Sequence, residues 1–202
     1  MKDEERPAAT KAYPALDEYG VIGDMESAAL VSRDGSIDWL CLPRFDSAWI
    51  FGRLLDWQHG GHLRVAPEEG RGSARQYRTD SNVLETTWVA GRNQAQVIDF
   101  MPLRGDGRAA SAPESLRLLR LIQPMRGTLP WRIDFCPIFD CGRTVPRLSQ
   151  SVPGVVTARF GSEAVTPQSP PPFRPARGEA RWRLLGRPRV GRRASDACRA
   201  PA

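Results

Sequence analysis

Residues 28–42 have the sequence AALVSRDGSIDWLCL, which places an apolar run on each side of an Asp-Gly pair. A tight turn between two strands requires a positive φ, and glycine adopts it without steric cost. Asp34 is explained by the same turn, because an aspartate side chain there accepts hydrogen bonds from nearby backbone amides. The stretch therefore predicts a β-hairpin with Gly35 in its turn and no catalytic role for Asp34.

Short segments of the same kind follow along the chain, separated by turn residues. In residues 131–135 the apolar side chains occupy every second position, as in a strand with one buried face. Further strands are predicted at residues 62–66, 82–89, 94–101, 115–122 and 152–160. Many short strands joined by turns favour an all-β fold, an antiparallel β-sandwich. One short helix is expected over residues 48–55, with Ile50, Phe51, Leu54 and Leu55 on one side.

The length and composition fit a single domain with an appended tail. The chain has 202 residues, of which 41% are hydrophobic and 26% are charged. No apolar run approaches the roughly 20 residues needed to cross a bilayer, and the first residues lack the apolar core of a secretory signal. We therefore expect a cytoplasmic protein without a membrane partner. Its expected parts are a flexible N-terminus at residues 1–12, a sandwich at 13–165 and a tail at 166–202.

The excess positive charge of the chain belongs to this tail. The net charge is +6, and residues 167–202 alone carry nine arginines, two acidic residues and seven prolines. Such a composition cannot bury enough apolar surface to offset the entropy of ordering, so disorder is expected. One interpretation is an arginine-rich arm that binds phosphates. The chain holds only two lysines against many arginines, which indicates GC-rich coding DNA. We therefore favour the alternative that the tail is an out-of-frame translation of such DNA, and we expect no nucleic-acid partner.

The cysteines and histidines form no metal-site pattern. No C-x-x-C spacing occurs among the four cysteines, Cys41, Cys136, Cys141 and Cys198. The two histidines, His59 and His62, flank a Gly-Gly pair and are interpreted as surface turn residues. A structural zinc site requires four closely organised ligands. We predict no metal ion and no cofactor.

Carboxylate pairs are the remaining candidates for chemistry. The candidate pairs are Asp34 with Asp38, Asp38 with Asp46, and Asp134 with Asp140. Asp38 and Asp134 alternate with apolar residues and are interpreted as solvent-facing strand positions. Asp46 is interpreted as a cap of the expected helix, or as the partner of Arg44 in an ion pair that orders the loop. No catalytic residue is predicted.

Four segments of the chain resemble a known family. They are YGVIGD at residues 19–24, AALVSRDGSIDWLCLPRFDS at 28–47, VIDFMP at 97–102 and RIDFCPIFDCGR at 132–143. With shorter matches between them, the resemblance extends over residues 13–163. The chain closely resembles the start of bacterial glycoside hydrolase family 15 proteins, the glucoamylase- and trehalase-like enzymes. It departs from the family pattern at Ala48, where proline is usual.

The resemblance implies the architecture and activity of a longer enzyme. In that family an N-terminal antiparallel β-supersandwich precedes an α/α barrel, which carries two glutamates and hydrolyses α-glucosidic bonds with inversion. The resemblance implies that this chain is a truncated, non-catalytic N-terminal domain with an incomplete supersandwich. Its partner would be the missing barrel, and trehalose or a maltooligosaccharide would be bound only through that barrel. The alternative is a stand-alone carbohydrate-binding β-sandwich, in which Trp49 and Trp57 stack on sugar rings.

The loop at residues 43–47 and the start of the next element supply the candidate binding residues. These are Arg44, Phe45, Asp46 and Trp49. They combine a cation, aromatic rings and an acid, a mixture suited to an interface with paired charge. We expect them to bind substrate or to face the missing catalytic domain. Without that domain, Phe45, Trp49, Ile50 and Phe51 would form an exposed apolar patch, so self-association is expected.

Overall fold

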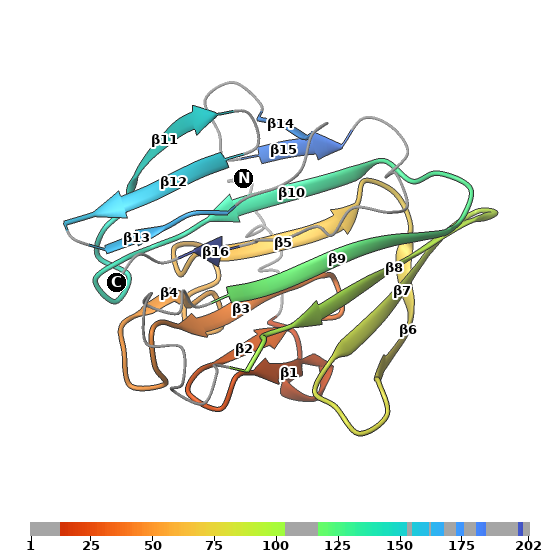
Figure 1. Ribbon diagram of the computed structural model, residues 1–202, viewed down its shortest axis with the longest axis horizontal. Helices are drawn as coiled ribbons and strands as arrows, with labels where there is room; N and C mark the ends of the chain where they lie inside the picture. The colour runs from red at the N-terminus through yellow and green to blue at the C-terminus, as the bar shows by residue number, and fades with distance from the viewer. Residues whose placement is uncertain are drawn as a thin grey trace, which may run out of the picture.

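The computed structural model describes residues 13–103, 117–152, 155–161, 163–167, 173–175, 181–184 and 198–199. Over these residues the fold is all-β, as Figure 1 shows. One 3-10 turn, η1 (Leu16–Glu18), precedes strands that pair in antiparallel fashion. The predicted fold class is confirmed. In this described part of the chain, no helix has the length and hydrophobicity needed to cross a membrane.

The larger sheet has the strand order β1-β2-β3-β5-β10-β15-β14, with β4 paired to β3. Its strands are β1 (Gly20–Gly23), β2 (Ala28–Val31), β3 (Ser36–Cys41), β4 (Trp49–Phe51), β5 (His62–Pro67), β10 (Trp131–Cys136), β14 (Phe173–Pro175) and β15 (Arg181–Leu184). The predicted hairpin is the β2–β3 pair. Its turn holds Gly35 at a φ of 79°, and the Ser36 N–H donates to Asp34. Both the hairpin and the turn role of Asp34 are confirmed.

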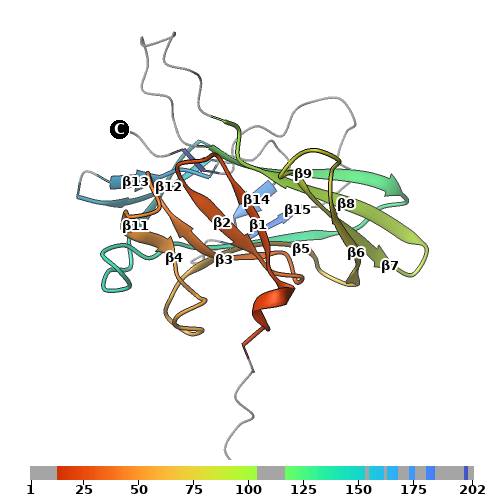
Figure 2. The same ribbon diagram turned by 90° about the horizontal axis from the view of Figure 1, so that it is seen from below.

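The second sheet has the order β16-β9-β8-β7-β6. Its strands are β6 (Arg71–Tyr77), β7 (Leu84–Ala90), β8 (Asn93–Phe100), β9 (Arg117–Arg126) and β16 (Cys198–Arg199). In Figure 2, β8 and β9 lie in a layer above β3 and β5, so the two sheets form a sandwich. A smaller third sheet consists of β11 (Arg147–Val152), β12 (Val155–Phe160) and β13 (Glu163–Val165).

The hydrophobic core lies between the two layers. Leu40, Trp131 and Phe135 enter it from the larger sheet, and Leu84 and Val97 enter it from the second, each at most 1% exposed. Alternation of side chains along each strand directs these residues to the inner face. Their removal from water is the main stabilising contribution to the fold.

A buried ion pair joins the two layers. Arg120 on β9 donates from Nε and Nη2 to the two carboxylate oxygens of Asp99 on β8, at 2.8 and 3.1 Å. Its Nη1 donates across to the larger sheet, to the carbonyl oxygens of Gly35 and Leu63 at 2.8 and 3.0 Å. Arg120 is 7% exposed and Asp99 is 1% exposed. One guanidinium therefore holds both sheets by charge-assisted hydrogen bonds.

The short helix expected over residues 48–55 is a wrong prediction. β4 occupies its first part, where Phe51 pairs with Leu40 and Trp49 pairs with Cys41. The pairing with β3 overrides the helical spacing of the apolar residues, which is a weak local preference. The expected apolar patch is also reduced, because Ile50 is 5% exposed and Phe51 is fully buried.

The solvent-facing positions predicted for Asp38 and Asp134 are wrong as well. Asp38 is fully buried and Asp134 is 8% exposed. Asp38 lies on the outer face of the larger sheet, but Tyr19 and Arg53 contact it there. Asp134 accepts a hydrogen bond from Arg132 Nε at 2.8 Å. The alternation of side chains along the strands correctly places these carboxylates on the face away from the core. Their burial depends on side chains from elsewhere in the chain, which cover them.

The two ends of the chain fall mainly outside the described residues. The expected flexible N-terminus, residues 1–12, lies wholly outside them. Of the tail at 166–202, the structure describes residues 166–167 and three short strands, β14, β15 and β16. Within these described residues, Trp131 of β10 pairs with Leu184 of β15, so β15 follows β10 in the larger sheet.

Candidate functional site

The loop at residues 43–47 is closed by its own polar groups. Arg44 Nε lies 3.2 Å from Asp46 Oδ1, and both side chains are largely exposed. The Arg44 N–H donates to Ser47 Oγ at 3.1 Å, and the Ser47 N–H donates to the Arg44 carbonyl at 3.1 Å. The predicted Arg44–Asp46 ion pair is confirmed. The helix-cap interpretation of Asp46 is wrong, because strand β4 follows the loop.

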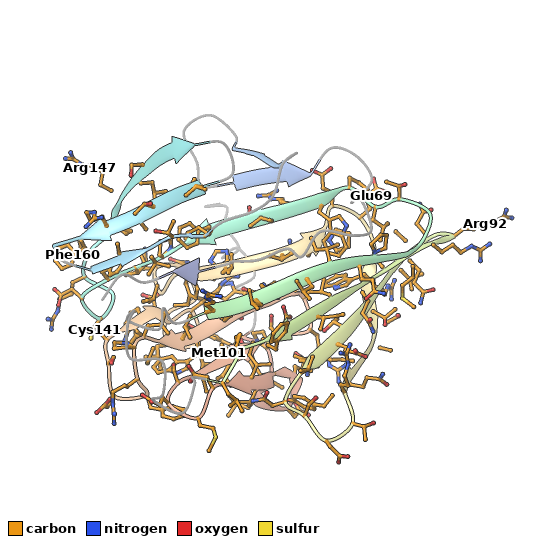
Figure 3. All side chains as sticks on the ribbon, viewed as in Figure 1. Glu69, Arg92, Met101, Cys141, Arg147 and Phe160 are labelled. Carbon is orange, nitrogen blue, oxygen red and sulfur yellow. The ribbon has the colours of Figure 1, made fainter. Side chains whose placement is uncertain are left out.

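Phe45, at the tip of this loop, belongs to a group of exposed apolar residues. Its side chain is 61% exposed, and its N–H donates to the carbonyl of Glu26 in the β1–β2 loop at 2.9 Å. Met25 in that loop is 83% exposed, and Val145, in the loop after β10, is 80% exposed. Figure 3 places Cys141, from this last loop, and Phe160 at one end of the molecule. We call the exposed residues Met25 and Phe45, whose loops the hydrogen bond from Phe45 to Glu26 joins, the apolar loop end.

Trp49 does not share the exposure of Phe45. A Cβ atom added at Gly52 would lie 2.4 Å from the Trp49 ring, and one added at Gly142 would lie 2.5 Å from it. The ring is therefore packed closely against two backbone segments and joins β4 to the loop after β10. Of the four predicted site residues, the structure brings Arg44, Phe45 and Asp46 together at the surface and gives Trp49 a packing role.

Three residues in the β1–β2 loop and in the loop after β10 adopt backbone conformations that non-glycine residues rarely take. Met25, Asp140 and Cys141 have φ values of 74°, 51° and 48°. A left-handed conformation at such residues costs free energy and persists only where the surrounding structure enforces it. The hydrogen bond between the Phe45 and Glu26 backbones and the packing of Gly142 on Trp49 supply such restraints. The loops are thus held in defined positions.

Asp38 is the centre of a polar cluster that the sequence analysis missed. The Tyr19 hydroxyl donates to Asp38 Oδ2 at 2.9 Å, Ser36 Oγ donates to Oδ1, and Arg53 Nη1 lies 3.8 Å from Oδ1. Burial raises the pKa of Asp38, although the hydrogen bonds from Ser36 and Tyr19 oppose this effect. Burial and the nearby Asp38 carboxylate raise the pKa of Tyr19. Asp38 is fully buried, so it has no access to a substrate.

Two further carboxylates of the described sandwich, Asp34 and Asp99, lie beside arginine side chains. Burial favours a higher pKa at Asp34, but the Ser32 hydroxyl and the Arg64 guanidinium, whose Nε lies 3.3 Å from Oδ2, outweigh it and lower the pKa. Asp99 is buried against Arg120. Among the described residues, no three His, Cys, Asp or Glu side chains form a group suited to a metal ion. The geometry of these groups is that of structural ion pairs.

Residues 8–170 match the family described as trehalase-like, N-terminal. The chain belongs to this family. The match spans the sandwich and ends near the start of the arginine-rich tail. The family resemblance identified from the sequence is thereby confirmed at the level of the trehalase-like N-terminal domain.

Curated relatives of this trehalase-like domain are trehalases. The trehalase of Thermoplasma volcanium is 32% identical over 149 residues, which are 72% of this chain and 23% of the relative. Trehalase 1 of Sulfolobus acidocaldarius is 32% identical over 136 residues, which are 67% of this chain and 22% of the relative. The trehalase of Mycolicibacterium smegmatis is 41% identical over 83 residues, which are 41% and 12% of the two chains. The chain thus spans less than a quarter of these relatives. Among solved structures, none matches it significantly.

Proposed function

We propose that this chain is the non-catalytic N-terminal domain of a family 15 glycoside hydrolase. A separate α/α barrel would hydrolyse the α-glucosidic bond of trehalose, or of a maltooligosaccharide, with inversion. The family match over residues 8–170 carries this proposal, together with the similarity to trehalases. Cys41 and Cys141 carry free thiols, which fits the reducing cytoplasm as the compartment.

The chemistry of inversion supports a non-catalytic role for the sandwich. An inverting glycosidase needs a carboxylic acid that protonates the leaving oxygen and a carboxylate that activates water, about 6.5–9.5 Å apart. The acid requires a raised pKa and access to the substrate. In the described residues, Asp38 has the raised pKa but is fully buried. Exposed Asp46 is paired with Arg44 in the loop.

The chain alone is therefore expected to release no glucose. Incubation with trehalose, maltose or soluble starch should give glucose equal to that of a blank, measured with a coupled glucose assay. The matched control is the Asp46→Asn variant, which should also equal the blank. Turnover that persists through repurification and disappears in this variant would contradict the proposal, since it would identify Asp46 as a catalytic carboxylate.

We also propose that the apolar loop end contacts the catalytic domain. The exposed Arg44–Asp46 ion pair flanks Phe45 in the same loop, and apolar side chains beside charged groups are typical of protein interfaces. The defined backbone of its loops fits a surface that docks without large rearrangement. This assignment keeps Arg44, Phe45 and Asp46 as interface residues and gives Trp49 the task of supporting the loop.

In the absence of that domain, the apolar loop end should make the chain self-associate. The variant Met25→Ser with Phe45→Ser should lower the apparent mass at high concentration, because it removes two exposed apolar side chains from one surface. Multi-angle light scattering measures the effect. Leu55→Ser is the matched control, since Leu55 is 63% exposed and lies in a different loop. A strictly monomeric wild-type chain, or an equal effect of Leu55→Ser, would argue against this interface.

A further inference from the structure

The loop between β4 and β5 is a rigid platform on the outer face of the larger sheet. The N–H groups of Gly52 and Arg53 donate to the carbonyls of Gly60 and Gly61 at 2.6 and 3.1 Å. The Leu54 N–H donates to the Asp38 carbonyl at 3.0 Å, which ties the loop to β3. A Cβ atom at Gly60 would lie 2.3 Å from the Gly52 carbonyl oxygen, so the two ends of the loop touch. Side chains on this loop are therefore presented in fixed positions.

Trp57 of this platform forms a corner with Tyr13 of the N-terminal segment. The two ring centroids are 5.6 Å apart and the rings are inclined at 68°. The backbone N–H of Trp57 donates to the Tyr13 hydroxyl at 3.0 Å, which fixes the two residues relative to each other. Tyr13 is 51% exposed and Trp57 is half-buried. In Figure 2, η1 and the β4–β5 loop both project below the larger sheet, so this corner faces outward.

The Arg53 side chain packs on one face of the Trp57 ring. Its guanidinium carbon lies 3.9 Å from the centroid of the Trp57 ring, a cation–π contact. The same guanidinium reaches toward Asp38 Oδ1 at 3.8 Å, and its Nε is buried without a hydrogen-bond partner among the described residues. The cation therefore fixes one face of Trp57 and anchors it to the buried carboxylate.

Polar side chains lie next to Trp57 in the sequence of the same loop. Asp56 Oδ1 accepts from the N–H groups of Gln58 and His59, both at 3.0 Å. Asp56 Oδ2 lies 3.2 Å from His59 Nδ1, and both side chains are more than half exposed. The backbone hydrogen bonds from His59 and Gln58 lower the pKa of Asp56, which keeps an anionic acceptor at this place. A carboxylate and an imidazole thus lie within two residues of Trp57 on the same loop.

We propose that this corner, formed by Tyr13, Trp57, Asp56 and His59, is a binding subsite for a glucopyranose ring of an α-glucoside. The apolar face of the sugar would pack on the aromatic rings, while Asp56 and His59 would hydrogen-bond its hydroxyl groups. Aromatic side chains with a few placed polar groups are the usual composition of small-ligand sites. The rigid loop limits the entropy lost on binding. The choice of α-glucoside rests on the proposed function.

The structure separates the two tryptophans considered for sugar stacking. Trp49 is packed against Gly52 and Gly142. Trp57 lies on a loop that projects from the sheet, next to an exposed tyrosine and an exposed carboxylate. The subsite is thus assigned to Trp57, away from the 43–47 loop.

Titration of the full chain with trehalose and with maltose tests the subsite. Two-dimensional NMR of the tryptophan indole N–H groups should show a saturable shift of the Trp57 signal, with a dissociation constant in the range of about 1–10 mM for so shallow a site. Trp57→Ala should weaken binding at least tenfold, and Tyr13→Ala should weaken it several-fold. Phe160→Ala is the matched control, because it removes an aromatic ring that is 40% exposed on β12 and should leave the affinity unchanged.

The thermal midpoint of each variant shows whether it is folded. If Trp57→Ala fails to fold, Asp56→Asn in the folded chain replaces it and should weaken binding several-fold. The absence of a saturable shift at about 100 mM sugar, or equal affinity in folded Trp57→Ala, would overturn the subsite. These outcomes are independent of the proposed function. A chain that binds neither sugar can still pair with a catalytic domain, and a chain that binds both can lack such a partner.

Discussion

Replacement of Arg120 by methionine is expected to lower the free energy of unfolding by about 3–5 kcal/mol. The substitution leaves Asp99 as a buried carboxylate without its cation and removes one hydrogen-bond donor from each of the Gly35 and Leu63 carbonyl oxygens. Because Arg120 bonds to both sheets, the loss affects their contact and not one strand alone. Urea unfolding followed by tryptophan fluorescence measures the change, with the slope of the transition testing for two-state behaviour.

Two variants separate this effect from a general cost of losing an arginine. Arg44→Met breaks the exposed Arg44–Asp46 pair and should change stability by at most about 1 kcal/mol. Arg120→Met combined with Asp99→Leu removes both buried charges and should recover much of the loss, since the unpaired carboxylate is the main penalty. A single Arg120→Met variant as stable as Arg44→Met would refute the role of this ion pair.

The strands were predictable because their signals are local. The Asp-Gly turn and the alternation in residues 131–135 each depend on neighbours in sequence, and both gave correct elements, β2–β3 and β10. Residues 48–55 failed because two patterns compete there. Ile50, Phe51, Leu54 and Leu55 have helical spacing, but the pairing partners of β4, Leu40 and Cys41, cannot be seen from the segment itself.

The candidate site was predictable to a similar degree. The exposure of Arg44, Phe45 and Asp46 follows from a short polar loop between strands, and the structure agrees. The burial of Asp38 was missed because Tyr19 and Arg53, from other segments, cover it. The aromatic corner was missed because Tyr13 and Trp57 meet only in the folded chain. The one available signal was the position of Asp38 between two apolar residues of its strand, which could have indicated that another segment covers it.

His62 should make the fold sensitive to mild acid. It begins β5, where it is half-buried and pairs with Cys136 across β10. Burial, followed by the positive charge of Arg53, lowers the pKa of His62 from 6.5 to about 4. The folded state therefore favours the neutral imidazole, whereas the unfolded chain is protonated below about pH 6.5. The stability that depends on neutral His62 is complete above pH 6.5 and is lost as the pH falls through 6.5 toward 4.

The expected loss over this window is about 3 kcal/mol, at about 1.4 kcal/mol for each pKa unit. His62→Gln should flatten the decline in unfolding free energy between about pH 7 and pH 4.5, because glutamine does not titrate. His59→Gln is the matched control, since exposed His59 should leave the decline unchanged.

Lowered pKa values at Asp34 and Glu85 add their losses of stability mainly below this pH window. The raised pKa of Asp38 acts in the opposite direction, because its protonation favours the folded state as the pH falls. A decline of equal size in wild type and His62→Gln would contradict this prediction, because it would mean that the folded chain protonates His62 without losing stability.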